Sequence, residues 1–212
     1  MRYVFHAALL LCGTVVQAAP FDMQFVDVDG RPVAGTVVAL RSTDPARAAS
    51  TPVAAMMDQL DLQFVPHVLV VPRGSSVSFR NSDKVGHQVY SFSPAKRFEL
   101  PLYRGEPREP QVFGVSGVVT LGCNIHDQMR AYVYVIDGQH HGRTDAQGRW
   151  SETDVVPGEY VLSIWHPRSR TSGPVLEQKI LVGTGTARHV LRAATGLKLR
   201  SESQVPANWD AY

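Results

Sequence analysis

The sequence contains little cysteine and little net charge, and each shortage excludes a class of protein. Two cysteines among 212 residues are too few for a disulfide-stapled scaffold. The 21 basic and 19 acidic residues give a formal charge of +2, which offers no electrostatic basis for binding nucleic acid. Long stretches with a 3.6-residue apolar period are also missing, so we expect few helices. The apolar content of 44% excludes a disordered chain, and the length fits one or two globular domains.

The N-terminus has the pattern of a secretory signal peptide. Arg2 precedes an apolar stretch over residues 3–16, and the small residues of Val16-Gln17-Ala18 follow it. This stretch is shorter than the roughly 20 residues that span a bilayer. We therefore predict a signal peptide over residues 1–18, cleavage after Ala18, export to a bacterial periplasm and no membrane span in the mature chain.

Short apolar or alternating runs dominate the rest of the chain, and Gly, Pro, Asp, Asn and Ser separate them. This spacing, with turn dipeptides such as Asp29-Gly30 and Pro157-Gly158, is typical of antiparallel β-sandwiches. We therefore predict an all-β protein. The expected strands include residues 23–28, 36–40, 68–71, 77–79, 87–92, 115–121, 131–136, 160–165 and 180–182.

Segments far apart in the sequence resemble the start and the end of one small β-sandwich. The run Val26–Leu40 at one end, and the run Thr144–Leu162 at the other, resemble a transthyretin-like or carboxypeptidase regulatory-like module. The resemblance implies a module split over residues 19–48 and 138–195. A second domain, over residues 55–137, is then inserted in this module or packed beside it. We expect the polar tail over residues 196–212 to be flexible.

The chemistry is concentrated in one short segment. Cys12 leaves with the signal peptide, so Cys123 is the only thiol of the mature chain and forms no intrachain disulfide. Cys123, His126 and Met129 follow a Cys-x2-His-x2-Met spacing. A thiolate, an imidazole and a thioether gathered on one loop suit copper. A further histidine, His87, stands upstream at the start of an expected strand and completes a four-ligand set.

These residues together resemble the cupredoxins, the blue copper family, and are most similar to amicyanin. The turn Asn81-Ser-Asp83, four residues before His87, matches that family too, and residues 90–103 resemble periplasmic proteins labelled methylamine-utilisation proteins. The resemblance implies a Greek-key β-sandwich that holds one type 1 copper ion. His87, Cys123 and His126 would be the trigonal ligands and Met129 the long axial ligand.

The same resemblance implies an electron carrier rather than an enzyme. Its partners would be redox proteins, such as a dehydrogenase or a c-type cytochrome, and the edge of His126 would face solvent as the electron exit. One position departs from the family pattern, because Gln88 stands where an asparagine usually ties the two ligand segments together.

Several alternatives stay open. Each of the four residues also has a structural interpretation when it is taken alone, for example Cys123 as a small buried hydrophobe. A Cys123–His126 catalytic dyad has no oxyanion site or orienting group nearby in the sequence. We interpret His140-His141 as solvated loop rather than as a second metal site. A copper-binding or delivery protein without redox cycling is the second functional hypothesis, and an adhesion or assembly module is the third.

Overall fold

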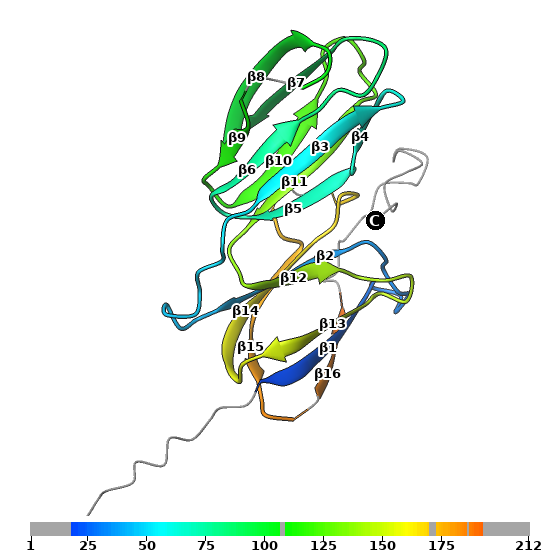
Figure 1. Ribbon diagram of the computed structural model, residues 1–212. Coiled ribbons are helices and arrows are strands. Elements are labelled where there is room, and N and C mark those ends of the chain that lie inside the picture. The colour runs from blue at the N-terminus through cyan, green and yellow to red at the C-terminus, as the bar shows by residue number, and fades with distance from the viewer. Residues whose placement is uncertain (1–17, 107–108, 170–172, 186, 193–212) are drawn as a thin grey trace, which may run out of the picture.

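The computed structural model describes residues 18–106, 109–169, 173–185 and 187–192. The predicted flexible tail lies outside these residues, as does the predicted signal peptide except for Ala18. All regular elements of the described residues are β-strands, which confirms the all-β prediction. No helix among them is long and apolar enough to cross a membrane. Figure 1 shows two stacked units, with the strands β3 to β11 above and the remaining strands below.

The upper unit consists of two packed sheets built from one continuous stretch of chain. Its sheets have the strand orders β5-β11-β10-β7-β8 and β4-β3-β6-β9. The pairs β3–β6 and β5–β11 are parallel, and the other pairs are antiparallel. The strands are β3 (Ala54–Leu60), β4 (Gln63–Val65), β5 (Val68–Pro72), β6 (Ser75–Phe79), β7 (His87–Ser93), β8 (Lys96–Tyr103), β9 (Gln111–Phe113), β10 (Gly117–Gly122) and β11 (Arg130–Ile136).

The lower unit combines both ends of the described chain. Its sheets have the strand orders β13-β1-β16 and β12-β2-β14-β15. The first and last strands, β1 and β16, pair in parallel, so the chain closes this unit after passing through the upper one. The strands are β1 (Ala19–Val26), β2 (Val37–Ser42), β12 (His140–Arg143), β13 (Arg149–Val155), β14 (Gly158–Trp165), β15 (Leu176–Val182) and β16 (Ala187–Arg192). The structure does not identify the type of this second sandwich, so its likeness to a carboxypeptidase regulatory-like module stays a prediction.

One strand, β11, contributes to two hydrophobic cores. Because side chains alternate along a strand, Ala131, Val133 and Val135 point into the core of the upper sandwich. Tyr134 and Ile136 point the other way, into a separate cluster that joins the two units. The strand β11, which follows the Cys-x2-His-x2-Met segment, is therefore packed against a hydrophobic core on each of its two faces.

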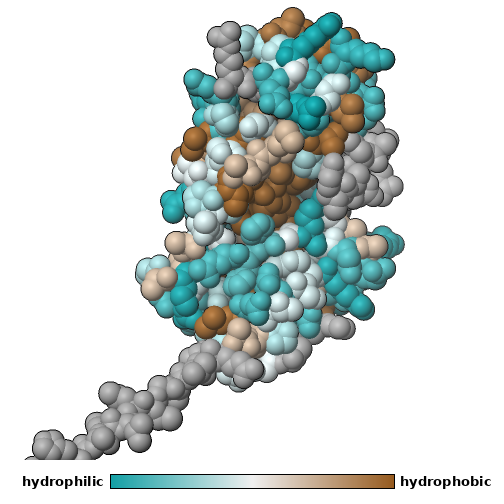
Figure 2. Space-filling view, viewed as in Figure 1, coloured by the Kyte–Doolittle hydropathy of each residue, from teal (hydrophilic) through white to brown (hydrophobic). Residues whose placement is uncertain are grey.

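The cluster between the units is apolar and centres on Trp165, which is 2% exposed. The Trp165 ring lies 5.2 Å from the ring of Tyr132 and 5.4 Å from that of Tyr134, measured between centroids. Val37 and Ala39 of β2 complete the lower side of the cluster. Figure 2 shows a hydrophobic area near this junction. Burial of these side chains holds the upper sheet that contains β11 against the lower sheet that contains β2 and β14.

The interpretation of His140-His141 as solvated loop is wrong. Both residues belong to β12, where His140 pairs with Leu40 and His141 with Ala39 of β2. They are half-buried, and Nδ1 of His140 lies 3.7 Å from the carboxylate of Glu152. Two neighbouring histidines between turn-rich segments show no apolar–polar alternation, so the sequence does not predict a four-residue strand there.

Candidate metal centre

The candidate site lies where the start of one strand meets the connection between two others, at one end of the upper unit. His87 is the first residue of β7, and Cys123 directly follows β10. Gly122, the last residue of β10, pairs with Tyr90 of β7, which brings the end of one strand beside the start of the other. His126 and Met129 lie in the short connection from β10 to β11, an antiparallel pair. The topology thus gathers residues that are 36 positions apart in the sequence.

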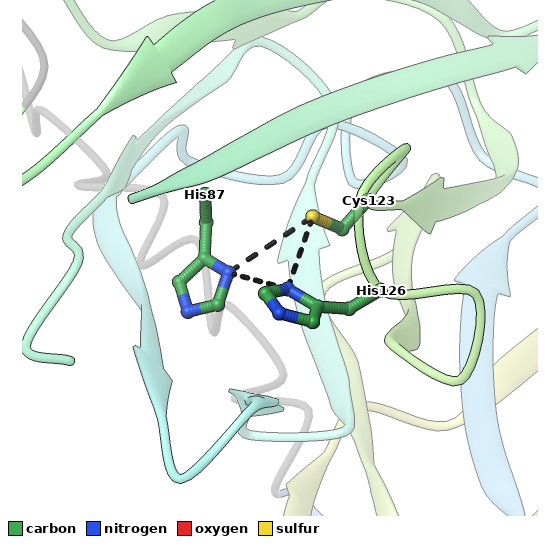
Figure 3. A group of neighbouring side chains, drawn as sticks. All are labelled: His87, Cys123 and His126. Carbon is green, nitrogen blue, oxygen red and sulfur yellow. Dashed lines mark hydrogen bonds between the residues drawn. The ribbon is translucent and has the colours of Figure 1, made fainter. Parts of the chain in front are cut away.

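Three of the predicted ligand atoms face one another, as Figure 3 shows. Nδ1 of His87 lies 3.2 Å from Nδ1 of His126. The Cys123 sulfur lies 4.0 Å from each of these nitrogens. Among the described residues this is the one group of three or more His, Cys, Asp or Glu side chains with ligand atoms so close together.

The size of this triangle fits a bound metal ion. The point equidistant from the two nitrogens and the sulfur lies about 2.2 Å from each of them, close to the roughly 2.0–2.3 Å of zinc–nitrogen and zinc–sulfur bonds. Two facing Nδ1 atoms only 3.2 Å apart cannot both carry protons, so at least one presents a lone pair to the other. Two imidazoles and one thiol are a donor set that copper accepts.

Burial differs between the two histidines in a way that matters for electron exchange. The His87 side chain is fully buried, and Cys123 is 3% exposed. His126 is only half-buried, so its ring is the member of the triad that is nearest to solvent. Next to it in the loop, the side chain of Ile125 is 52% exposed.

Met129 lies in the same region but is not part of the facing triad. Its side chain is 2% exposed and belongs to the apolar cluster that contains Cys123. Its backbone N–H donates to the carbonyl of His126 at 2.9 Å, which closes the loop as a tight turn. The role of its thioether as an axial ligand stays a prediction.

The outer nitrogen of His87 is held by a carboxylate. Nε2 of His87 lies 2.7 Å from Oδ2 of Asp83. The Asp83 carboxylate also accepts the backbone N–H groups of Asp61 and Leu62, at 2.8 and 3.0 Å. Partial burial raises the pKa of Asp83, but the Leu62 N–H, the His87 ring and the Asp61 N–H outweigh it and leave the pKa lower than usual. An ionised carboxylate here favours a proton on Nε2 and leaves Nδ1 free to bind a metal.

The turn before His87 is fixed by Asn81, which is 3% exposed. Its amide nitrogen donates to the carbonyls of Val85 and Tyr103, and its oxygen accepts the N–H of Asp83. Among the described residues, the Gln88 side chain forms no hydrogen bond with the segment that carries Cys123. Its amide instead lies 3.4 Å from the carboxylate of Glu99 on β8.

Sequence reasoning missed one packing feature beside Cys123. A Cβ atom at Gly122 would lie 2.6 Å from Cζ of Tyr90, so the Tyr90 ring covers the backbone directly before the thiol. The absence of a side chain at residue 122 is what allows this close approach. A glycine before a cysteine carries no signal of its own without knowledge of the strand that lies opposite.

Comparisons with known proteins give no family assignment. No family model matches the chain, and no curated protein matches it. Among solved structures, a purple cupredoxin from Nitrosopumilus maritimus is 24% identical over 39% of this chain and 99% of its own, with a TM-score of 0.35. A mutant amicyanin is 23% identical over 47% of this chain and 98% of its own, with a TM-score of 0.35. A copper-containing nitrite reductase from Thermus scotoductus is 20% identical over 53% of this chain and 28% of its own, with a TM-score of 0.37.

TM-scores of this size do not support an inference about the function of this chain. That inference rests on the atoms of the site itself. Those atoms define a two-histidine, one-cysteine centre in an all-β unit, with His87 and Cys123 buried and His126 half-buried. Its donor set is consistent with a type 1 copper site.

Proposed function

We propose that this chain is a periplasmic cupredoxin-type copper protein that carries single electrons between larger redox proteins. The observation that carries the proposal is the triangle of Nδ1 of His87, Sγ of Cys123 and Nδ1 of His126, which lies at one end of a close-packed sandwich. Bound copper would supply one-electron exchange between its two common oxidation states. The predicted ligand set is His87, Cys123, His126 and Met129, for one copper ion.

The residues around the triad support rapid exchange because they limit movement. His87 is held on one side by Asp83 and begins a strand, while Cys123 directly follows the end of another. The loop between Cys123 and Arg130 is short and closed by a hydrogen bond from Met129 to His126. Donor atoms that keep their positions in both oxidation states minimise reorganisation when an electron arrives or leaves.

The half-buried ring of His126 supports an electron exit at this end of the molecule. The exposed side chain of Ile125 adds apolar surface beside it, which suits a transient partner that binds through a small interface. We propose a redox protein partner here, such as a dehydrogenase or a c-type cytochrome. Neither nucleic acid nor a membrane span of the mature chain forms part of the proposal.

Protein-film voltammetry on the copper-loaded mature chain tests the carrier role. We expect a reversible one-electron wave with fast interfacial exchange. A sluggish or irreversible response from stoichiometrically bound copper would contradict electron transfer and favour the alternative of a copper-binding or delivery protein. An Ile125→Ser variant should retain the wave on the electrode but exchange electrons more slowly with a protein partner.

A further inference from the structure

The segment 123–129, which we call the site loop, is closed at its base by the two residues that flank it. Gly122, the last residue of β10, pairs with Arg130, the first residue of β11. Met129 is the last residue of the site loop and directly precedes Arg130. The position of the predicted axial ligand therefore depends on how the start of β11 is held.

His67, directly before β5, holds the start of β11 through both its backbone and its side chain. Its carbonyl accepts the N–H of Tyr132 at 2.9 Å. Its ring donates a hydrogen bond to the carbonyl of Arg130. Among the described residues Nδ1 of His67 has no hydrogen-bond partner, so Nε2 is the donor. These bonds extend the parallel pairing of β5 with β11 beyond its first pair, Val68 and Tyr132, toward the site loop.

Two aromatic rings connect this histidine to the lower unit. The ring of His67, which is 4% exposed, meets the ring of Tyr132 edge-on, at 5.5 Å between centroids. Tyr132 in turn lies 5.2 Å from the ring of Trp165, the last residue of β14 in the lower unit. Buried rings in contact have few alternative positions, because protein interiors are packed as densely as organic crystals. The lower unit therefore limits the movement of the side chain that holds Arg130.

We propose that His67 is a positioning residue of the metal centre and that the lower unit holds it in place. This inference rests on the proposed function, because it takes Met129 as the axial ligand of the copper site. The bond from Nε2 of His67 fixes the Arg130 carbonyl, and with it the adjoining backbone of Met129. The stack of Tyr132 and Trp165 prevents the histidine ring from turning away. The second unit thus serves the metal centre without contacting it.

Hydrogen exchange in the copper-free chain tests this positioning without any metal. The reporter is the Met129 N–H, whose bond to the His126 carbonyl closes the site loop. His67→Phe keeps a buried ring but loses the donor to Arg130, and we expect exchange at Met129 about tenfold faster. His67→Gln, whose amide nitrogen can take the place of Nε2, should restore most of the protection. Unchanged exchange at Met129 in folded His67→Phe would overturn the proposal.

His166→Phe is the matched control for this measurement. His166 is 1% exposed, and its Nε2 also lies 3.1 Å from a backbone carbonyl, that of Ala34 between β1 and β2. The variant loses a comparable bond away from β11, so exchange at Met129 should match that of the unmodified chain. Loop amides exchange through local openings, which a general loss of stability does not accelerate. Equal acceleration in both variants would contradict a specific role for His67.

Trp165→Leu tests the contribution of the lower unit, and it remains informative if His67→Phe does not fold. The change removes the ring that packs on Tyr132, so exchange at Met129 should become severalfold faster. Trp150→Leu is the control, because Trp150 is 8% exposed and packs in the core of the lower unit itself. Exchange at Met129 that is equal in the two tryptophan variants would contradict the support from the lower unit.

The copper-loaded chains separate failure of this inference from failure of the proposed function. Competition against a chelator should show copper binding about tenfold weaker in His67→Phe, and close to the unmodified value in His67→Gln and His166→Phe. Equal affinities in all of these chains would overturn the positioning role, even where the unmodified chain shows reversible one-electron exchange. Irreversible exchange by the unmodified chain, together with the expected losses in His67→Phe, would contradict the carrier function but support the role of His67.

Discussion

Nε2 of His87 lies 2.7 Å from Oδ2 of Asp83, so the most buried ring of the candidate centre is oriented by a carboxylate four residues earlier in the chain. The same carboxylate accepts two backbone N–H groups from the turn at Asp61 and Leu62, both of which have positive φ angles. One side chain thus fixes a strained turn, the tautomer of a ligand and the direction in which that ligand points.

Replacement of Asp83 by asparagine should weaken copper binding without removing a ligand. The amide keeps the shape of the side chain but loses the negative charge that favours a proton on Nε2 of His87. Changes of this kind typically cost 10–100-fold in metal affinity. Competition titration of copper against a chelator measures the change. Asp58→Asn is the matched control, because Asp58 accepts hydrogen bonds from Ser82 in the same region but does not contact a ligand. Equal losses in the two variants would contradict a specific role for Asp83.

Gly122→Ala should disturb the centre through packing alone. The added methyl carbon meets the Tyr90 ring at 2.6 Å, so the ring must move or the backbone before Cys123 must shift. Such overpacking costs about 1–3 kcal/mol. Chemical denaturation should show this loss, and the visible spectrum of the copper-loaded variant should shift. Adding Tyr90→Ser to the Gly122→Ala chain should restore most of the lost unfolding free energy. If the losses of the two single variants simply add in the double variant, residue 122 and the Tyr90 ring are not in contact.

Trp165→Ala should destabilise both units together. Trp165 is 2% exposed and contacts rings on β11 of the other unit, and large-to-small changes of this kind cost about 3–5 kcal/mol. Thermal unfolding followed by circular dichroism should shift as a single transition. Leu181→Ala, at a position that is 70% exposed, should cost less than about 0.5 kcal/mol. A loss confined to one of two separate transitions would show that the junction does not couple the units.

Acid should destabilise the chain through two buried histidines. Burial lowers the pKa of His67 to about 4 and that of His166 to about 3. Between pH 6.5 and those values the unfolded chain binds protons that the folded chain does not, so the free energy of unfolding falls as the pH decreases. Each histidine contributes a slope of about 1.4 kcal/mol per pH unit in this window. Urea denaturation of the copper-free chain at pH 7, 6, 5 and 4 measures the slope. His67→Gln should reduce this slope by about 1.4 kcal/mol per pH unit, the contribution of one proton. An unchanged slope would contradict the assignment.

Much of the candidate site was predictable because its signals are local. The Cys-x2-His-x2-Met spacing and the Asn81–His87 turn are short patterns whose chemistry does not depend on the remaining fold. The all-β class followed from alternating runs such as that of β11, where the period of two is set by the geometry of a strand.

The rest depends on contacts between distant segments. The match between Gly122 and the Tyr90 ring requires the register of β7 against β10, and the Trp165 cluster requires the stacking of two units. The bond from Asp83 to His87 joins residues that the turn motif had already placed four positions apart, but its partners at residues 61 and 62 come from another hairpin. No periodicity in the sequence encodes such pairings.

The central claim is that one sulfur and two imidazoles bind a single copper ion, and visible absorption with EPR on the copper-loaded chain tests it most directly. We predict an intense charge-transfer band and a small copper hyperfine splitting, both lost in Cys123→Ser while the variant stays folded. Weak absorption typical of tetragonal copper in the unmodified chain, or a strong band that survives in Cys123→Ser, would contradict the account.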